Sequence, residues 1–336
     1  MTSTGTIEPT AHRSRLARHR PVLLSAGRRL LVSVPVLVAL SVIVFLLLEL
    51  TPGDPAAFVA GEDATQAQVE ATRERLGLDR PIHVRYVDWA SDAVTGDLGE
   101  SLRLGQPVTT LIGDRLSPTL SIVVVTIGLS LLWAVPAGVT AAVRPDGWLD
   151  RGLSASASAA MAVPDFWLGL LLAFVFAVRL DWLPAVGYEP ISDGGVWGWL
   201  RGLLLPAAAL AAAPAAELAR QLRAALRDAL EQDYVRTAVA KGMNRRRVVL
   251  RHAGKNAAVP VITVFGLQVI RILGATIIVE TIFSIHGVGS LLGDAVLSGD
   301  IPVVQGIALV LGALVIASNF VVDTVNEAIL PRESRA

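Results

Sequence analysis

Long apolar stretches bounded by charged or turn-forming residues constrain this chain more than any other feature. The first runs from residue 30 to residue 50, long enough to cross about 30 Å of hydrocarbon as a helix. It is long for a signal peptide, and no small-x-small cleavage site follows it. Similar stretches follow at residues 118–143, 153–178, 203–218, 257–283 and 301–322. With 53% hydrophobic and 17% charged residues, the chain is predicted to be an all-α membrane protein with six transmembrane helices.

The distribution of Lys and Arg predicts which side of the membrane each loop faces. Residues 1–29 carry six Arg, residues 144–151 two, residues 217–255 ten Lys or Arg, and the C-terminal tail two. The short loops on the other side contain only Arg179 and Arg201, and long loops such as 51–117 weigh little in this rule. We therefore expect both termini in the cytoplasm, with tails at residues 1–29 and 333–336.

Composition excludes several kinds of chemistry. The chain has no Cys, so it has no disulfide and no thiol-based metal site. Its five His residues show no metal-ligand spacing, and no GxxxxGK[ST] motif is present to bind a nucleotide. No Ser/His or paired Asp set lies inside the spans, as an intramembrane enzyme would need. We therefore predict no catalytic residue, no metal ligand and no nucleic-acid partner.

The stretch DYVRTAVAKGMNRRRVVLRHAGKN, residues 233–256, is the most distinctive loop of the chain. Tyr234, Val235, Ala238 and Val239 fall on one apolar face of a short helix. Gly242 suits the left-handed position that ends such a helix, and a following Asn can cap a second helix over residues 245–253. A helix–Gly–helix with a basic rim is shaped to dock into a groove of a partner. The alternative interpretation is a solvated, positively charged cytoplasmic loop.

This loop resembles a known family. DYVRTAVAKG followed by RHAGKNA is similar to the cytoplasmic EAA loop of ABC importer permeases, in its dipeptide, oligopeptide and nickel version. TPGDPA, LGLDRP, GDLGESL and SIHGVGSLLGD also resemble that family. The chain departs from the general pattern at two places. Arg236, Thr237 and Ala238 stand where the pattern has Glu-Ala-Ala, and its later Ile-x-Leu-Pro is absent.

The resemblance implies a type I ABC importer permease fold, with a single permease domain at residues 30–332. That domain would contain an external segment at residues 51–117 and a cytoplasmic coupling loop at residues 217–256. The residues that would couple to an ATP-binding subunit are Asp233, Tyr234, Val235, Arg236, Ala238, Val239, Lys241 and Gly242.

The resemblance also implies partners. They are a second homologous permease subunit, two ATP-binding subunits that carry ATP and Mg²⁺, an extracytoplasmic substrate-binding protein and the lipid bilayer. This chain would bind no cofactor and would not be an enzyme. It would lie in the cytoplasmic membrane of a prokaryote and pass peptides, nickel chelates or similar small solutes by alternating access. The alternative is an ion-gradient-driven secondary transporter, but the inverted repeats and broken midplane helices typical of that class are not evident.

Within the external segment, two short helices are expected. Residues 65–76 read as an amphipathic helix stopped at Gly77, and residues 81–94 as a second helix. GDLGES reads as a turn. The segment is either a scaffold or part of the docking surface for the substrate-binding protein.

Charged groups inside the spans are candidates for the translocation path. Arg271 lies near the middle of the fifth span, where a cation is costly unless it meets water or a partner. We expect it to meet a substrate carboxylate or an acid of a partner subunit. Asp165 follows Pro164, which is expected to kink the third span. Glu280 lies on the opposite helix face from Arg271, either on the path or at the outer interface.

The sixth span carries a polar stripe near its inner end. Asn319, Asp323 and Asn326 recur at i, i+4 and i+7. Asn319 and Asp323 are further candidates for the path, and the alternative interpretation of the stripe is hydrogen bonding between helices.

Overall fold

The computed structural model describes residues 33–46, 49, 54–61 and 63–329, and the regular secondary structure in this part of the chain is helical apart from one isolated β-bridge between Glu100 and Pro107. A helix at Ser33–Leu46 precedes the labelled elements. These are α2 (Pro55–Ala60), α3 (Gln66–Arg75), α4 (Ile82–Thr95), α5 (Val108–Val143), α6 (Trp148–Ala162), α7 (Asp165–Leu172), the π-helix η1 (Ala173–Arg179), α8 (Ile191–Leu230), α9 (Asp233–Ala240), α10 (Arg245–Arg247), the π-helix η2 (Val248–Ala253), α11 (Gly254–Ile282), α12 (Val288–Leu297) and α13 (Ile301–Ile329).

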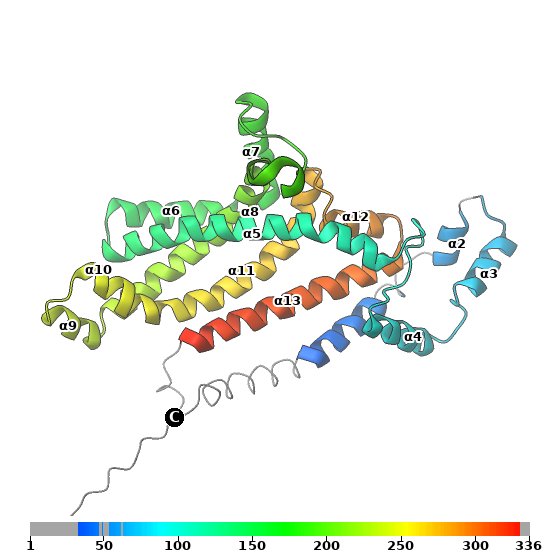
Figure 1. Cartoon of the computed structure of the whole chain (residues 1–336), viewed down its shortest axis with the longest axis horizontal. Helices are drawn as coiled ribbons and strands as arrows, with labels where there is room; N and C mark the ends of the chain where they lie inside the picture. The colour runs from blue at the N-terminus through cyan, green and yellow to red at the C-terminus, as the bar shows by residue number, and fades with distance from the viewer. Residues whose placement is uncertain (1–32, 47–48, 50–53, 62, 330–336) are drawn as a thin grey trace, which may run out of the picture.

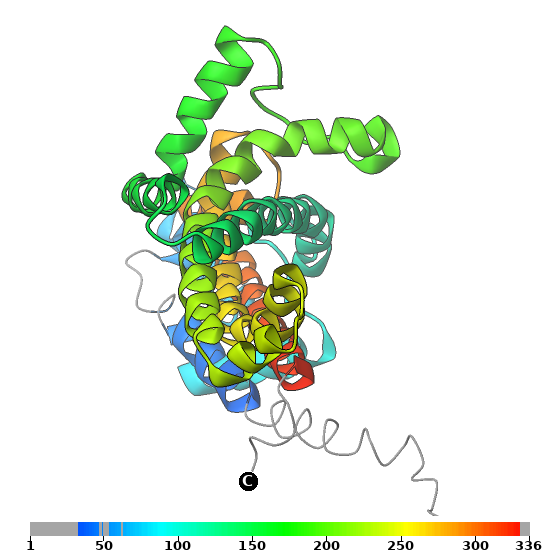
Figure 2. The ribbon, with the colours of Figure 1, turned by 90° about the vertical axis from the view of Figure 1, so that its left-hand side faces the viewer.

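The long helices α5, α8, α11 and α13 run along the long axis of the molecule (Figure 1). The short helices α9 and α10 lie at one end of this bundle, and α2, α3, α4 and α12 lie at the other. The second view shows α7 and the first part of α8 projecting from the bundle (Figure 2). The fold therefore separates the basic loop at residues 233–256 from the acidic segment at residues 54–107.

Within the described residues, four helical stretches are long and apolar enough to cross a membrane: Val108–Val143, Ile191–Leu230, Arg245–Ile282 and Ile301–Glu327. A fifth crossing is possible through the bent pair α6 and α7–η1. At 1.5 Å per residue, α5 and α8 are about 50–60 Å long, so both extend beyond a hydrocarbon core of about 30 Å. These extensions reach the short helices at the ends of the bundle.

The predicted third span, residues 153–178, is broken rather than merely kinked. Residues 150–162 and 165–179 form two helices that meet at 101°. Pro164 cannot donate a backbone N–H, and residue 163 before it adopts an extended conformation, as expected before proline. The prediction of a kink at Pro164 is confirmed, and the bend is larger than a kink within one helix.

Several predicted boundaries differ from the structure. The second span begins at Val108 rather than at residue 118, so Pro118 lies buried inside α5. The fourth span, predicted at residues 203–218, is part of α8, which starts at Ile191 and has a non-helical backbone at Gly195. Helix α8 also continues past the predicted span to Leu230. The predicted first span, residues 30–50, is described only in part, and both predicted tails lie outside the described residues.

Small residues allow close packing between α5 and α8. A Cβ added at Gly138 of α5 would lie 2.8 Å from the carbonyl oxygen of Ala219 and 3.0 Å from Cβ of Leu222, both on α8. The buried part of α8 is rich in Ala, including Ala207, Ala209 and Ala213. Such small side chains let helix backbones approach each other inside a membrane.

The segment predicted to be external, residues 51–117, forms the expected short helices in its described part. Thr65 caps α3 in a capping box with Gln68, and Gly77 has a φ of +64° just after the helix. The inward side of α3 carries Thr72, its one buried residue, rather than an apolar stripe. Helix α4 packs on the helix Ser33–Leu46, where the rings of Phe45 and Tyr86 meet edge to face at 5.5 Å. Helix α4 is thereby attached to the first apolar helix.

Candidate functional site

The loop at residues 233–256 folds as a helix, a sharp turn and a second helix. Helix α9 ends at Ala240, and Gly242 has a φ of +77°. The Asn244 side chain accepts a hydrogen bond from the backbone N–H of Arg246 at 2.9 Å and caps α10. The predicted helix–Gly–helix with its Asn cap is confirmed. The second helix does not stop at residue 253, since α10 and η2 continue directly into α11.

The predicted apolar face of α9 is divided between the chain's own core and the surface. Val235 and Ala238 are buried in a cluster with Leu226 of α8 and Val249 of η2. Val239 is 56% exposed and Tyr234 is 40% exposed. In this structure, Val235 and Ala238 therefore attach α9 to the bundle, and Tyr234 and Val239 are the apolar side chains available to another protein.

The charged candidates of α9 lie on its open side. Asp233, Arg236 and Lys241 are exposed, and Arg236 lies 3.6 Å from Asp233, one turn earlier. Arg245 donates a hydrogen bond to the carbonyl oxygen of Val143 at 3.1 Å, which ties the turn to the end of α5. The surface around the exposed apolar residues is thus charged and mostly basic.

A contact that sequence reasoning missed links α9 directly to α11. The amide nitrogen of Asn256 lies 2.8 Å from the hydroxyl oxygen of Tyr234. A cavity of about 450 Å³ lies beside this contact, lined by Gln221 and Asp228 of α8 among others. A displacement of α9 would therefore reach the start of α11 through a hydrogen bond as well as through apolar packing.

Two of the candidates for the translocation path share one pocket. Asp165 at the start of α7 and Arg271 in α11 both line a cavity of about 330 Å³ beside the break between α6 and α7. Arg271 is exposed in the isolated chain, and Asp165 is half-buried. Arg271 is close enough for its charge to act on the Asp165 carboxylate. The third and fifth predicted spans thus contribute opposite charges to the same place.

Glu280 does not lie with them. Its side chain is 0% exposed, and it accepts hydrogen bonds from the Thr119 hydroxyl at 2.7 Å and the Ser290 backbone N–H at 2.9 Å. Thr119 in turn accepts the backbone N–H of Val288 at 2.8 Å. This enclosed network joins α5, α11 and the start of α12. Glu280 therefore joins three helices and is fully enclosed in this structure.

The polar stripe of α13 is divided in a similar way. Asn319 and Asp323 are exposed, while Asn326 donates a hydrogen bond to the Thr263 hydroxyl of α11 at 3.2 Å. Asn326, the last residue of the stripe, thus forms a hydrogen bond between helices, as the alternative interpretation predicts. No group of three or more His, Asp or Glu side chains in the described residues is arranged to hold a metal ion.

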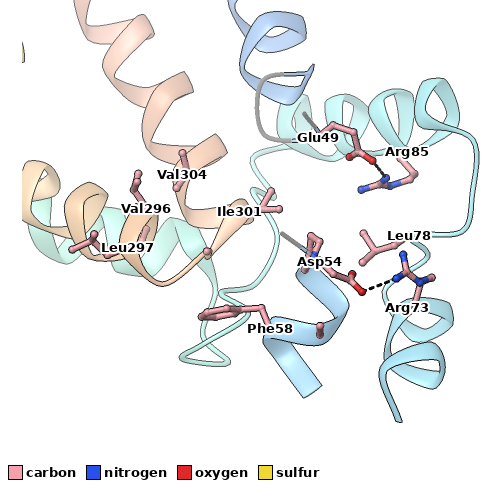
Figure 3. Close-up of a pocket in the computed structure, with 14 residues that line it drawn as sticks. Glu49, Asp54, Phe58, Arg73, Leu78, Arg85, Val296, Leu297, Ile301 and Val304 are labelled. Carbon is pink, nitrogen blue, oxygen red and sulfur yellow. Dashed lines mark hydrogen bonds and ion pairs between the residues drawn. The ribbon is translucent and has the colours of Figure 1, made fainter. Parts of the chain in front are cut away.

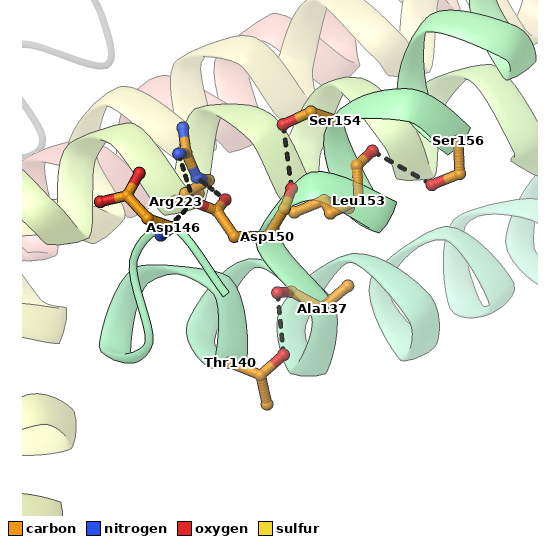
Figure 4. Close-up of polar contacts among 8 residues, drawn as sticks. All are labelled: Ala137, Thr140, Asp146, Asp150, Leu153, Ser154, Ser156 and Arg223. Carbon is orange, nitrogen blue, oxygen red and sulfur yellow. Dashed lines mark hydrogen bonds and ion pairs between the residues drawn. The ribbon is translucent and has the colours of Figure 1, made fainter. Parts of the chain in front are cut away.

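A buried ion pair lies near the loop at residues 233–256 and was not predicted. Arg223 of α8 donates a hydrogen bond to Asp150 at 2.7 Å, and Asp150 also accepts the backbone N–H of Asp146 at 3.1 Å (Figure 4). Asp150 is almost fully buried, and Arg223 is a quarter exposed. The pair joins the start of α6 to the extension of α8. No sequence signal identified it, because both residues lie in segments where charge is expected anyway.

The opposite end of the molecule contains a larger cavity, of about 780 Å³, between α2, α3, α4, α12 and α13 (Figure 3). Two ion pairs lie on one side of it, Arg73 with Asp54 at 2.6 Å and Arg85 with Glu49 at 2.7 Å. The exposed side chains of Val296 and Leu297 lie on the other side. Residues 54–85 and α12 thus line one concave surface.

The apolar helices make this chain a multi-pass membrane protein, and comparison with known proteins identifies its family. Residues 134–335 match the family described as "Binding-protein-dependent transport system inner membrane component", and residues 23–123 match its N-terminal companion family. The chain is 39% identical over 305 residues to a probable peptide ABC transporter permease protein, y4tP, of Sinorhizobium fredii. That alignment covers 91% of this chain and 97% of the relative.

A second relative and a solved structure agree with this result. The oligopeptide transport system permease protein AppB of Bacillus subtilis is 37% identical over 307 residues, covering 91% of this chain and 97% of the relative. A chain of the MetNI methionine ABC transporter in an inward-facing conformation matches with a TM-score of 0.55 at 18% identity. It covers 66% of this chain and 97% of the MetNI chain, and at this identity the likeness concerns the fold.

The chain therefore belongs to the family of inner membrane components of binding-protein-dependent transport systems. It is a permease subunit of an ABC importer, as the resemblance of the loop at residues 233–256 predicted. The alternative of an ion-gradient-driven secondary transporter is not supported by these matches.

Proposed function

We propose that this chain and a second homologous permease subunit form the translocation path of an importer for peptides. The observation that carries the coupling part of this proposal is the division of α9 into an anchored side and an exposed side. The peptide substrate is supported by relatives named as peptide and oligopeptide permeases. Nickel chelates and similar small solutes are the other candidate substrates.

In this proposal, energy comes from ATP and Mg²⁺ bound on two partner subunits, and the chain itself binds no cofactor and hydrolyses nothing. The exposed residues of α9, with Tyr234 and Val239 at their centre, insert into a cleft of an ATP-binding subunit. Val235 and Ala238 pack α9 against α8 and η2. A displacement of α9 would therefore also displace the long helices α8 and α11. Closure of the ATP-binding subunits would thereby rock the bundle between its two openings.

We further propose a type I arrangement with six crossings and both termini in the cytoplasm of a prokaryote. The crossings would be the helix Ser33–Leu46, α5, the bent pair α6 and α7–η1, α8, α11 and α13. The ten Lys and Arg residues at 217–255 support a cytoplasmic α9–α10 end. The segment at residues 51–107 would then face outward and receive the substrate-binding protein.

Single-cysteine cross-linking tests the coupling role of α9, because the natural chain contains no Cys that could react elsewhere. In the assembled transporter, Val239→Cys should cross-link to a cysteine placed in the cleft of the ATP-binding subunit. Ala238→Cys is the matched control, since Ala238 is only 5% exposed and packs on the chain's own core. Equal cross-linking of both, or of neither, would contradict the proposed docking.

Labelling with a membrane-impermeant thiol reagent tests the orientation. Leu297→Cys, at a position 89% exposed on α12, should react from outside intact cells. Val239→Cys should react only after the membrane is permeabilised.

ATP-dependent uptake of a labelled dipeptide by the complete transporter, together with its binding protein, tests the substrate. An absence of uptake with every short peptide tried, alongside uptake of a nickel chelate, would overturn peptide import.

A further inference from the structure

The break between α6 and α7 creates a pocket with a specific composition. Its cavity measures about 330 Å³ and is enclosed by the end of α6, the start of α7 and one side of α11. It contains one carboxylate, Asp165, and one guanidinium, Arg271. Arg271 lies within an apolar stretch long enough to cross the membrane. Charges at such positions are costly, and they mark substrate pathways unless they are otherwise paired.

Neither charge is paired within the described part of the chain. No hydrogen bond there involves either side chain, and no nitrogen of Arg271 lies within the 4.0 Å of a carboxylate oxygen that defines an ion pair. Both side chains nevertheless line the same cavity of about 330 Å³. The two groups therefore face the same cavity across a gap wider than an ion pair. A ligand that carries both a negative group for Arg271 and a positive group for Asp165 can occupy that gap.

The rest of the wall is apolar. Met161 at the end of α6, Phe166 on α7 and Ile278 on α11 all line the pocket and are exposed. Met and aromatic side chains adapt to ligands of different shape. A cavity of this volume is at the small end of the range for small-molecule sites, about 300–1,000 Å³. The ligand that fits has an amino group, a carboxylate and a small apolar body.

We propose that this pocket is a binding site within the translocation path for a short zwitterionic peptide. Arg271 binds the C-terminal carboxylate, and Asp165 binds the N-terminal amino group. The planar guanidinium suits a carboxylate because it donates two parallel hydrogen bonds. The backbone break at Pro164 places Asp165 at the pocket, at the start of α7, where it lies beside α11. The proposal rests on the proposed function of peptide import and assigns it a ligand-binding pair.

Equilibrium binding to the complete transporter in lipid nanodiscs, without nucleotide and without the substrate-binding protein, tests this assignment. The probes are alanyl-phenylalanine, its C-terminal amide and its N-acetyl derivative. The wild-type complex should bind the free dipeptide more tightly than either blocked form. Arg271→Gln should weaken binding of the free dipeptide roughly 10- to 100-fold and leave the amide unchanged. Asp165→Asn should weaken binding of the free dipeptide to a similar extent and leave binding of the N-acetyl form unchanged.

Two further variants separate a ligand contact from a structural effect. Arg271→Lys keeps the charge but loses the paired geometry, so it should restore part of the affinity. Arg151→Gln is the matched control, because Arg151 is also an exposed Arg but lies at the far end of α6, away from the pocket. It should leave binding of all three probes unchanged.

Several outcomes would overturn the proposal. Equal binding of the free and blocked dipeptides to the wild type would do so, as would a loss in Arg271→Gln that is the same for all three probes. A drop in the yield of assembled complex without any change in peptide selectivity would assign the pair to a subunit contact instead. If ATP-dependent dipeptide uptake continues unchanged in both variants, peptide import stands and this pocket proposal fails.

Discussion

Asp150, at the start of α6, and Arg223, on the extension of α8, form an ion pair between positions 73 residues apart. The pair lies beside the apolar cluster that anchors α9, since Leu226 of that cluster is one turn beyond Arg223 on α8. Because α6 leads to the break at Pro164, the pair connects the end of α8 that packs on α9 to the bent helix pair α6 and α7–η1.

The first prediction concerns the strength of this contact. Arg223→Gln should lower the free energy of unfolding by about 1–3 kcal/mol, because it leaves the Asp150 carboxylate buried without its charged partner. The measurement is the thermal unfolding of the purified complex in detergent. Arg220→Gln is the matched control, since Arg220 lies one turn earlier on α8 and pairs with Glu217 at the surface. Exposed pairs of this kind contribute only about 0.3–0.5 kcal/mol.

Reversing the charges separates the ion pair from the size of its side chains. Asp150→Arg combined with Arg223→Asp should recover part of the stability lost in Arg223→Gln. Recovery should be incomplete, because Asp150 also accepts the backbone N–H of Asp146 and an arginine cannot accept it. A double variant that is less stable than Arg223→Gln would show that the two charges do not act as a pair.

The second prediction concerns the buried network around Thr119. Thr119→Val keeps the shape of the side chain but removes the hydroxyl that joins the Val288 N–H to Glu280. Two buried polar groups lose a partner, so the free energy of unfolding should fall by about 1–3 kcal/mol. Thr140→Val on the same helix is the control, because its exposed hydroxyl bonds only within α5 and the change should lie within about 0.5 kcal/mol. Equal thermal stability of the two variants would contradict a structural role for this network.

The third prediction compares two glycines of α5. Gly138→Ala places a methyl group 2.8 Å from a carbonyl oxygen of α8, so the two helices must separate. Overpacking of this kind costs about 1–3 kcal/mol. Gly128→Ala meets no heavy atom within 4 Å and should be neutral or stabilising by up to about 1 kcal/mol. Thermal unfolding of both variants checks the close approach of α5 and α8, and a Gly138→Ala as stable as Gly128→Ala would rule it out.

Much of this fold could be predicted because its signals are local. The length and apolarity of residues 108–143 and 301–329 are enough to indicate helices that cross a membrane. The turn after α9 could be predicted because Gly242 and Asn244 each favour one backbone geometry. Boundaries were less predictable, since α5 and α8 extend past the apolar stretch as continuous helices.

The rest depends on contacts between distant residues, which leave no local pattern. Pro164 predicts a break, but the 101° angle depends on packing of α7, whose Gly169 lies close to Phe283 and Ala209. Glu280 looked like a path or interface residue because its partner Thr119 is 161 positions away. The apolar face of α9 was predicted as one surface because periodicity cannot tell which side packs on the chain itself.

The last prediction concerns Gly242. Its φ of +77° is a conformation that side chains with a Cβ rarely adopt, and an added Cβ would meet nothing within 4 Å. The cost of substitution is therefore backbone strain, about 1–2 kcal/mol, rather than crowding. Gly242→Val should distort the turn and change the orientation of Tyr234 and Val239. This would lower peptide uptake and the stimulation of ATPase activity by the substrate-loaded binding protein. The chain should still insert into the membrane at normal levels.

Gly242→Asn is the matched control for that experiment, because Asn adopts the left-handed conformation far more readily than Val does. It adds a larger polar side chain at the same open position, so it separates backbone strain from the mere presence of a side chain. We expect Gly242→Asn to retain most of the stimulated ATPase activity that Gly242→Val loses. If both variants lose it equally, the side chain itself blocks docking. If neither loses it, the turn after α9 has no part in coupling ATP hydrolysis to transport.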